Sequence, residues 1–189
     1  MNVSATRPGV PILNIPSGHL TAGFRKIIER GYASIRQEAQ DWLDAHVGRL
    51  MGEDAEKVRF YAAAVAACDA AEIFVSRYGT ACLEKAKTCT DEARRQELEQ
   101  MADSLFWISK NPCRHYWEAC QQAILYQHLL KISHIGDSGS FGRFDQYTWP
   151  YLRADLESGY VTREQAQEIT DAFFLKINSM YTGGNPQLI

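Results

Sequence analysis

Hydrophobic residues recur at intervals of three and four along most of the chain, which is the spacing of one face of an α-helix. The first such stripe spans residues 24–43 and consists of Phe24, Ile27, Ile28, Tyr32, Ile35, Ala39, Trp42 and Leu43. Gly31 interrupts this stripe, so we expect a kink there or a break into two helices. Gly48 and Gly52 end the segment. Three prolines and a glycine before it predict an extended or looped lead-in over residues 1–16.

Two of the helices predicted next, over residues 53–87 and 114–134, are hydrophobic around most of their circumference. Such a helix is expected to be buried on several sides. A single small core cannot cover that much helix surface. Asp69 and Glu72 fall inside the first of these helices and need partners if they are buried. Both helices are therefore expected to belong to a larger folded body.

Capping signals predict the remaining helices. Thr90 is predicted to be the N-cap of a helix over residues 91–109. A short helix is expected over residues 144–156. Thr162 and Gln165 form a capping box that begins a helix ending near residue 179. The predicted architecture is mainly α-helical, with little sequence left to build a sheet.

Composition and charge narrow the class of protein. The 189 residues include 20 Lys and Arg and 23 Asp and Glu, which gives a net charge of −3. This mild acidity argues against a nucleic-acid partner, because such binding depends on clustered basic residues. No hydrophobic run approaches the length that spans a bilayer, and no secretory signal is evident. A soluble, cytoplasmic protein with no membrane partner is expected.

The cysteines indicate neither a disulfide framework nor a zinc site. They are odd in number and contain no C-x-x-C pair; they are Cys68, Cys82, Cys89, Cys113 and Cys120. We interpret them as reduced structural thiols, and no metal site is predicted. His128 and His134 lie six residues apart on one predicted helix, on different faces, so a shared metal ion is not expected.

Two segments carry candidate chemistry. One is a loop, Pro16-Ser17-Gly18-His19, which delivers a histidine just before a helix. The other is the glycine-serine turn Gly136–Gly142 (GDSGSFG), which follows an apolar helix and supplies hydroxyls and a carboxylate. A solvated or capping histidine and an ordinary helix C-terminus are the alternative interpretations of these two segments. No P-loop, dinucleotide-binding, H-E-x-x-H or G-x-S-x-G motif is present.

The run that follows this turn resembles the glycyl radical enzymes of the pyruvate formate-lyase family. GRFDQYTWPYLRADL, residues 142–156, matches the family pattern G-R-[FM]-D-Q-Y-x-x-P-Y-x-x-x-D-L, and a T-x-E-x-A helix follows it. Further matches occur in the family's order. They are Gly18-His19, Lys57–Tyr61, Arg77-Tyr78, and Asn111-Pro112 before Tyr116–Gln121. The similarity covers nearly the whole chain from about residue 15.

The resemblance implies a ten-stranded α/β barrel, to which this chain contributes outer helices and a little of the barrel. Residues 17–189 would be a partial pyruvate formate-lyase-type domain. Family members carry a radical-relay cysteine, often as C-x-E, and a glycyl radical loop of R-V-x-G-Y type, neither of which we assign here. Cys82-Leu83-Glu84 matches C-x-E, but it lies inside a predicted helix upstream of the expected place. We therefore expect an internal fragment that is inactive by itself.

The family also implies a mechanism and partners. A glycyl radical oxidises the cysteine to a thiyl radical, which abstracts hydrogen from the substrate. No metal or organic cofactor is expected on this chain, and an S-adenosylmethionine-dependent iron–sulfur activase installs the radical. The expected partners are the remainder of the parent enzyme, the activase, a small-molecule substrate and a second copy in a homodimer.

Site residues follow from the dehydratase branch of the family. A histidine in the Gly-His position and a polar residue in the glycine-serine turn hold the departing hydroxyl there, and these positions correspond to His19 and Asp137 or Ser138. Ser138 and Phe141 are candidates to line the substrate pocket. An acid at position 137 is what trans-4-hydroxyproline dehydratase-like members imply. The residues after the turn are expected to fasten it to neighbouring helices; they are Arg143, Asp145, Gln146 and Tyr147.

Other parent enzymes remain open from the sequence. They are a glycerol- or propanediol-type dehydratase, a choline-type C–N lyase, an arylacetate decarboxylase and a formate-lyase acting on a keto acid. A stand-alone helical interaction module that kept the family sequence without the radical chemistry is the alternative from another class.

Overall fold

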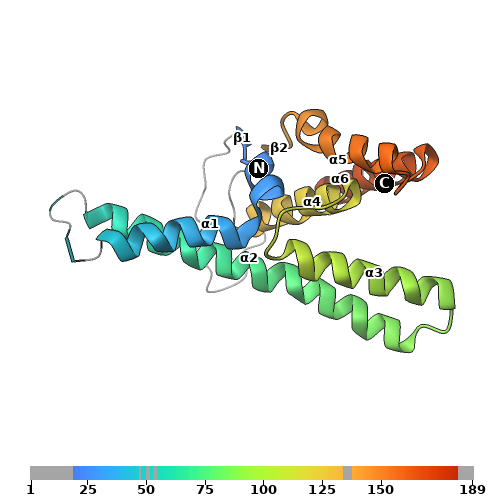
Figure 1. Ribbon diagram of the computed structural model, residues 1–189, viewed down its shortest axis with the longest axis horizontal. Coiled ribbons are helices and arrows are strands. Elements are labelled where there is room, and N and C mark those ends of the chain that lie inside the picture. The colour runs from blue at the N-terminus through green and yellow to red at the C-terminus, as the bar shows by residue number, and fades with distance from the viewer. Residues whose placement is uncertain (1–18, 47, 50–51, 53–54, 134–137, 183–189) are drawn as a thin grey trace, which may run out of the picture.

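The computed structural model describes residues 19–46, 48–49, 52, 55–133 and 138–182. Within these residues the chain forms six helices and two strands of three residues (Figure 1). In chain order they are β1 (His19–Thr21), α1 (Phe24–His46), α2 (Ala55–Thr88), α3 (Glu92–Ile108), α4 (Tyr116–Ile132), β2 (Ser138–Ser140), α5 (Phe144–Ser158) and α6 (Arg163–Thr182). The prediction of a mainly helical chain is confirmed. None of the described helices combines the length and apolar composition needed to cross a membrane.

The helices form two arms that meet at α4. In one arm, α2 and α3 pack as a hairpin, and α1 lies against the first half of α2 (Figure 1). In the other, α5 and α6 pack against α4. The core lies where these groups meet, and its most buried side chains come from α1, α2, α3 and α4; they are Phe24, Ile28, Val75, Leu105, Ile108 and Ala119.

Gly31 breaks α1, as its place in the hydrophobic stripe predicted. Its φ of 69° and ψ of 163° are not helical. The break frees the carbonyl of Ile28, which accepts a hydrogen bond from the N–H of Cys113 at 2.9 Å. The N–H of Ala33 donates to the carbonyl of Lys110, also at 2.9 Å. The residues that connect α3 to α4 are therefore hydrogen-bonded to α1 on both sides of its break.

The helix starts follow capping rules, with one correction. Asp91, and not Thr90, is the N-cap of α3, because its carboxylate accepts hydrogen bonds from the N–H groups of Ala93 and Arg94. A carboxylate at this position also interacts favourably with the helix dipole. The capping box before α6 is confirmed: the hydroxyl of Thr162 accepts from the N–H of Gln165, and the Gln165 side chain accepts from the N–H of Thr162.

Large hydrophobic side chains on α2 and α6 stay exposed among the described residues. On α2 they are Phe60, Ile73, Tyr78 and Leu83, and on α6 they are Phe174 and Leu175. Phe60 and Leu175 keep 68% and 71% of their surface exposed, which is far more than is usual for large hydrophobic side chains of a complete protein core. The two acids inside the apolar stretch of α2 do have partners: Asp69 pairs with Arg36 and Glu72 with Lys110.

Candidate functional site

The two segments singled out in the sequence lie side by side in the fold. Strands β1 and β2 pair in parallel, with His19 opposite Ser138, the next pair Leu20 and Gly139, and Thr21 opposite Ser140. Each strand runs directly into a helix, β1 into α1 and β2 into α5 (Figure 1). The backbones of positions 19 and 138 are therefore neighbours, although most of the chain separates them in sequence. Asp137 lies outside the described residues.

The end of β2 is held by a tyrosine. The phenol of Tyr147 donates a hydrogen bond to the carbonyl of Phe141 at 3.0 Å. Burial raises the pKa of Tyr147 well above its usual range, so the phenol keeps its proton and remains a donor. Gly142 adopts a φ of 62°, and a Cβ at this position would lie 2.8 Å from Cγ2 of Thr21 on the neighbouring strand. The turn after β2 is thus packed closely against β1.

Phe141 has a packing role in the fold. Its ring stacks on Phe24 of α1, with centroids 5.2 Å apart, and meets Phe173 of α6 edge-on at the same distance. It also lines a pocket of about 270 Å³ where the two strands enter their helices. The other lining residues are Thr21–Arg25, Gly142, Arg143, Gln146 and Tyr147. The backbones of His19 and Ser138 lie at the other ends of the two strands.

A polar network fixes the start of α4, which carries the residues that face β2. The carboxylate of Asp155 on α5 accepts from the N–H of Tyr116 at 2.7 Å and lies 2.8 Å from Nδ1 of His115. Glu118 is 1% exposed and accepts from the backbone and the guanidinium of Arg114. These contacts satisfy donors that a helix start leaves without intrahelical partners.

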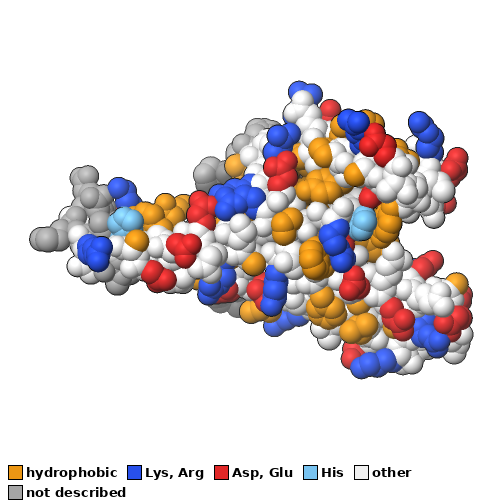
Figure 2. Space-filling model, viewed as in Figure 1, with side chains coloured by type: hydrophobic (Ala, Val, Ile, Leu, Met, Phe, Trp, Pro, Cys, Tyr) orange, Lys and Arg blue, Asp and Glu red, His pale blue; other side chains and the backbone are white. Residues whose placement is uncertain are grey.

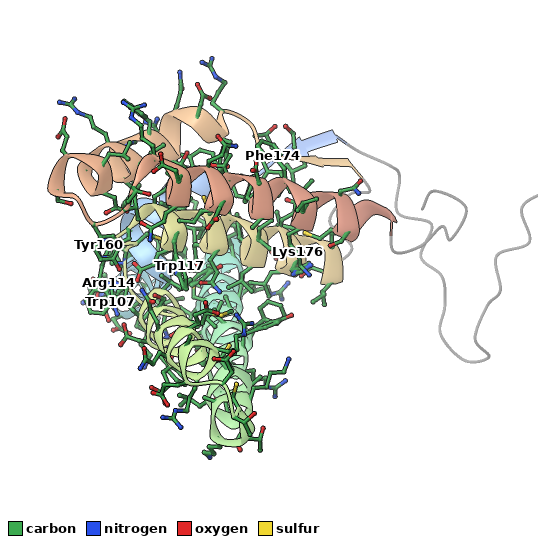
Figure 3. All side chains as sticks on the ribbon, turned by 90° about the vertical axis from the view of Figure 1, so that its right-hand side faces the viewer. Trp107, Arg114, Trp117, Tyr160, Phe174 and Lys176 are labelled. Carbon is green, nitrogen blue, oxygen red and sulfur yellow. The ribbon has the colours of Figure 1, made fainter. Side chains whose placement is uncertain are left out.

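Aromatic rings close over this network. Figure 3 shows Trp107, Arg114 and Tyr160 close together at the start of α4, with Phe174 and Lys176 farther along α6. The Arg114 guanidinium lies 4.5 Å from the centroid of the Trp107 ring, and Tyr160 stacks on His115 at 3.8 Å. No role for these residues was predicted from the sequence. Their contacts anchor the start of α4.

The described part of the chain shows buried, protonated thiols and no cluster of metal-binding side chains. All five cysteines are free. Burial raises the pKa of Cys120 to about 12 and that of Cys113 further, so both remain protonated and unreactive at neutral pH. Across residues 19–46, 55–133 and 138–182, no three His, Cys, Asp or Glu side chains gather in a way that could hold a metal ion. Cys82 lies within α2, a place unlike the loop that a radical-relay cysteine occupies.

Comparison with known proteins decides what this arrangement belongs to. The sequence model of the family described as "Pyruvate formate lyase-like" matches residues 13–187. The chain belongs to this family. An isethionate sulfite-lyase from Desulfovibrio desulfuricans is 34% identical over 153 residues, which cover 80% of this chain and 18% of that protein.

Solved structures of pyruvate formate lyase-like proteins share the fold. The glycerol-bound B12-independent glycerol dehydratase from Clostridium butyricum superposes with a TM-score of 0.78 at 30% identity, over 86% of this chain and 20% of the other. Hydroxyproline dehydratase from Clostridioides difficile, bound to trans-4-hydroxy-L-proline, gives a TM-score of 0.74 at 27% identity, over 82% of this chain and 20% of its own. The chain spans about a fifth of the length of these relatives.

Family membership accounts for the exposed apolar faces. The chain corresponds to a helical portion of glycyl radical enzymes whose remaining four fifths it does not span. Figure 2 shows orange hydrophobic patches between charged residues along both arms. A helix that is hydrophobic on several sides is expected to be buried on those sides. The predicted resemblance is therefore confirmed, whereas the two short strands here are too little to display the barrel that it implies.

Proposed function

We propose that this chain is part of a glycyl radical lyase that eliminates water from a small hydroxylated substrate. His19 and Asp137 hold the departing hydroxyl in this proposal, with Ser138 and Phe141 as lining residues. The observation that carries it is the parallel register of β1 and β2, which puts position 19 opposite position 138. Asp137 is the residue directly before that position.

The chemistry explains why such a pair is required. Hydroxide is a poor leaving group, so the hydroxyl departs only when a nearby acid donates a proton to it. A carboxylate beside an imidazole orients the ring and shares that proton. The glycyl radical and its relay cysteine, which generate the substrate radical, belong to the part of the enzyme that this chain does not span.

The lead substrate in the proposal is trans-4-hydroxyproline. The acid at position 137 supports it, because related enzymes with N-G-H-S in this turn have no carboxylate there. A similar protein, hydroxyproline dehydratase, is 27% identical to this chain. The activase and a homodimer remain proposals that follow from family membership.

A sulfite-eliminating lyase is the second candidate. The identity to the isethionate sulfite-lyase, 34%, exceeds the 27% to hydroxyproline dehydratase. Both reactions remove a leaving group next to a substrate radical, so the same strand pair serves either. A non-catalytic helical module is not favoured, because the family match extends over nearly the whole chain and large hydrophobic side chains stay uncovered.

The first test is to read the coding DNA beyond the codon for Ile189. We expect the frame to continue through a C-x-E loop and an R-V-x-G-Y loop. A stop codon there, with neither loop in a neighbouring frame, would overturn the assignment to a catalytic polypeptide. The complete enzyme, activated anaerobically, is then assayed with trans-4-hydroxyproline, glycerol, propane-1,2-diol and isethionate.

Variants of the complete enzyme test the two site residues. His19→Gln and Asp137→Asn should each lower the turnover of a hydroxylated substrate by roughly 10²- to 10⁴-fold, the usual contribution of general acid–base catalysis. Asp171→Asn is the matched control, because Asp171 is exposed on α6 and its carboxylate bonds to Gln167 on the same helix. Normal turnover in Asp137→Asn removes Asp137 from the proposed role. Release of sulfite from isethionate, with no dehydration product, selects the second candidate.

A further inference from the structure

Gln127 is a buried polar side chain of α4. It is 1% exposed, and its neighbours Ala123, Ile124 and Leu125 are all buried. Burying an amide is costly unless it forms hydrogen bonds. Its Nε2 donates to the carbonyl of Gly139, the central residue of β2, with the two atoms 3.2 Å apart. A buried side chain from the core therefore reaches the strand that carries the candidate site.

Gly139 leaves room for this contact. A Cβ at position 139 would lie 2.3 Å from Nε2 and 3.2 Å from the amide carbon of Gln127. The first distance is far below van der Waals contact, so the glutamine amide occupies the space that any other residue at 139 would need. The pair is thus matched in both shape and hydrogen bonding.

The contact is made at the centre of β2, one residue from the candidate site. Gly139 follows Ser138 directly and pairs with Leu20, the residue after His19. Tyr147 holds the other end of the strand through the carbonyl of Phe141. Side chains from two helices, Gln127 of α4 and Tyr147 of α5, therefore hydrogen-bond to backbone carbonyls on either side of Ser140.

We propose that Gln127 is a positioning residue, which sets the location of Ser138 relative to His19 by holding the carbonyl of Gly139. This inference rests on the proposed function. Gln127 does not touch the substrate; it acts through the strand. Loss of the Gln127 amide shifts the residues proposed to hold the leaving group but does not remove them. Substrate affinity and turnover therefore change, while the glycyl radical still forms.

The test uses the complete activated enzyme. Gln127→Met keeps the length of the side chain and removes the donor, and it should lower kcat/KM by roughly three- to tenfold, the effect of one lost hydrogen bond. The glycyl radical content per chain, measured by electron paramagnetic resonance, should stay at the wild-type level. Gln121→Met on the same helix is the matched control and should leave both quantities unchanged.

A pair of variants separates shape from hydrogen bonding. Gly139→Ala should reduce kcat/KM at least as much as Gln127→Met does, because the added Cβ forces the Gln127 amide away from the carbonyl of Gly139. Adding Gln127→Ala to Gly139→Ala removes the clash, so the double variant should melt at a higher temperature than Gly139→Ala. Its kcat/KM should rise no higher than that of Gln127→Ala alone. Full recovery of kcat/KM in the double variant would contradict a role for the hydrogen bond.

A second measurement needs no activity. Hydrogen exchange of the complete enzyme, before activation, should show faster exchange at the amides of residues 19–21 and 138–140 in Gln127→Met than in the wild type. If kcat/KM falls by less than twofold and exchange is unchanged, Gln127 has no positioning role. If the wild-type enzyme is inactive on all four substrates, the proposed function fails, whereas altered exchange in the variant still supports the contact between Gln127 and β2.

Discussion

The carboxylate of Asp155, in the second half of α5, caps α4 at a distance of 39 residues in the chain: it accepts a hydrogen bond from the backbone N–H of Tyr116 at 2.7 Å. The same carboxylate lies 2.8 Å from Nδ1 of His115. His115, the N-cap residue of α4, makes no capping hydrogen bond with its own side chain. A residue from another helix therefore accepts the capping hydrogen bond that a serine or aspartate at the N-cap usually accepts.

Replacement of Asp155 tests this cap. Asp155→Ala leaves the N–H of Tyr116 and the ring of His115 without their acceptor, and should lower the free energy of unfolding by about 1–3 kcal/mol. Urea unfolding of the 189-residue chain, followed by circular dichroism, measures the difference. Asp171→Ala on α6 is the control: its carboxylate bonds only to the exposed Gln167, among the contacts described. Equal effects of the two substitutions would show that Asp155 is not a cap.

Gly31 should not tolerate any other residue. A Cβ there would lie 2.4 Å from the carbonyl oxygen of Lys110 and from the carbonyl carbon of Asn111, both backbone atoms that cannot move aside. Gly31→Ala should cost more than about 3 kcal/mol, since it combines backbone strain with a clash. Gly159 is a matched control, because its φ of 73° is similar but no heavy atom lies within 4 Å of its Cβ position. Gly159→Ala should cost only about 1–2 kcal/mol, the strain of a left-handed conformation.

Removing the hydroxyl of Tyr32 and that of Tyr116 should have opposite effects on stability. The hydroxyl of Tyr32 is buried and has no hydrogen-bond partner among the described residues. Tyr32→Phe should therefore leave the melting temperature unchanged or raise it, because no bond is lost and a desolvated polar group is removed. Tyr116→Phe should destabilise the chain by about 1 kcal/mol, because the Tyr116 hydroxyl lies 2.8 Å from that of Thr170. A larger loss in Tyr32→Phe than in Tyr116→Phe would contradict this interpretation.

His128 should make the chain less stable in mild acid. Its pKa is lowered, first by burial and then by the positive charges of Lys176 and Lys131. The unfolded chain therefore binds a proton at this histidine more readily than the folded chain does, so stability falls as pH drops through about 6.5. His128→Gln should flatten the change in melting temperature between about pH 7.5 and pH 5. Identical pH profiles for the variant and the wild type would show that His128 does not contribute.

The helices were predictable because their signals are local. The break at Gly31 and the Thr162–Gln165 capping box depend on residues within one or two turns, and both were confirmed. The predicted N-cap of α3, Thr90, was wrong by one residue. Thr90 and Asp91 are both good caps, and the choice between them depends on where the chain leaves α2.

The contacts between distant segments were not predictable from patterns in the chain. Nothing near Tyr116 indicates that Asp155 caps it, and nothing near Gly139 indicates that Gln127 reaches it. Gln127 did leave one signal, a polar residue in an apolar helix, which implies a buried partner. The site residues came from family resemblance, and of these Asp137 lies outside the described residues while His19 and Ser138 are adjacent in the strand register.

The parallel pairing of β1 and β2 also bears on how the chain is made. During synthesis β1 leaves the ribosome first, and it has no partner until α1, α2, α3, α4 and finally Ser140 have followed. At common rates of translation this interval is on the order of 10 s. The helical hairpins can form within that time from local contacts, whereas the strand that carries position 19 must wait. The strand pair proposed to bind substrate therefore forms only after α1, α2, α3 and α4 have been synthesised.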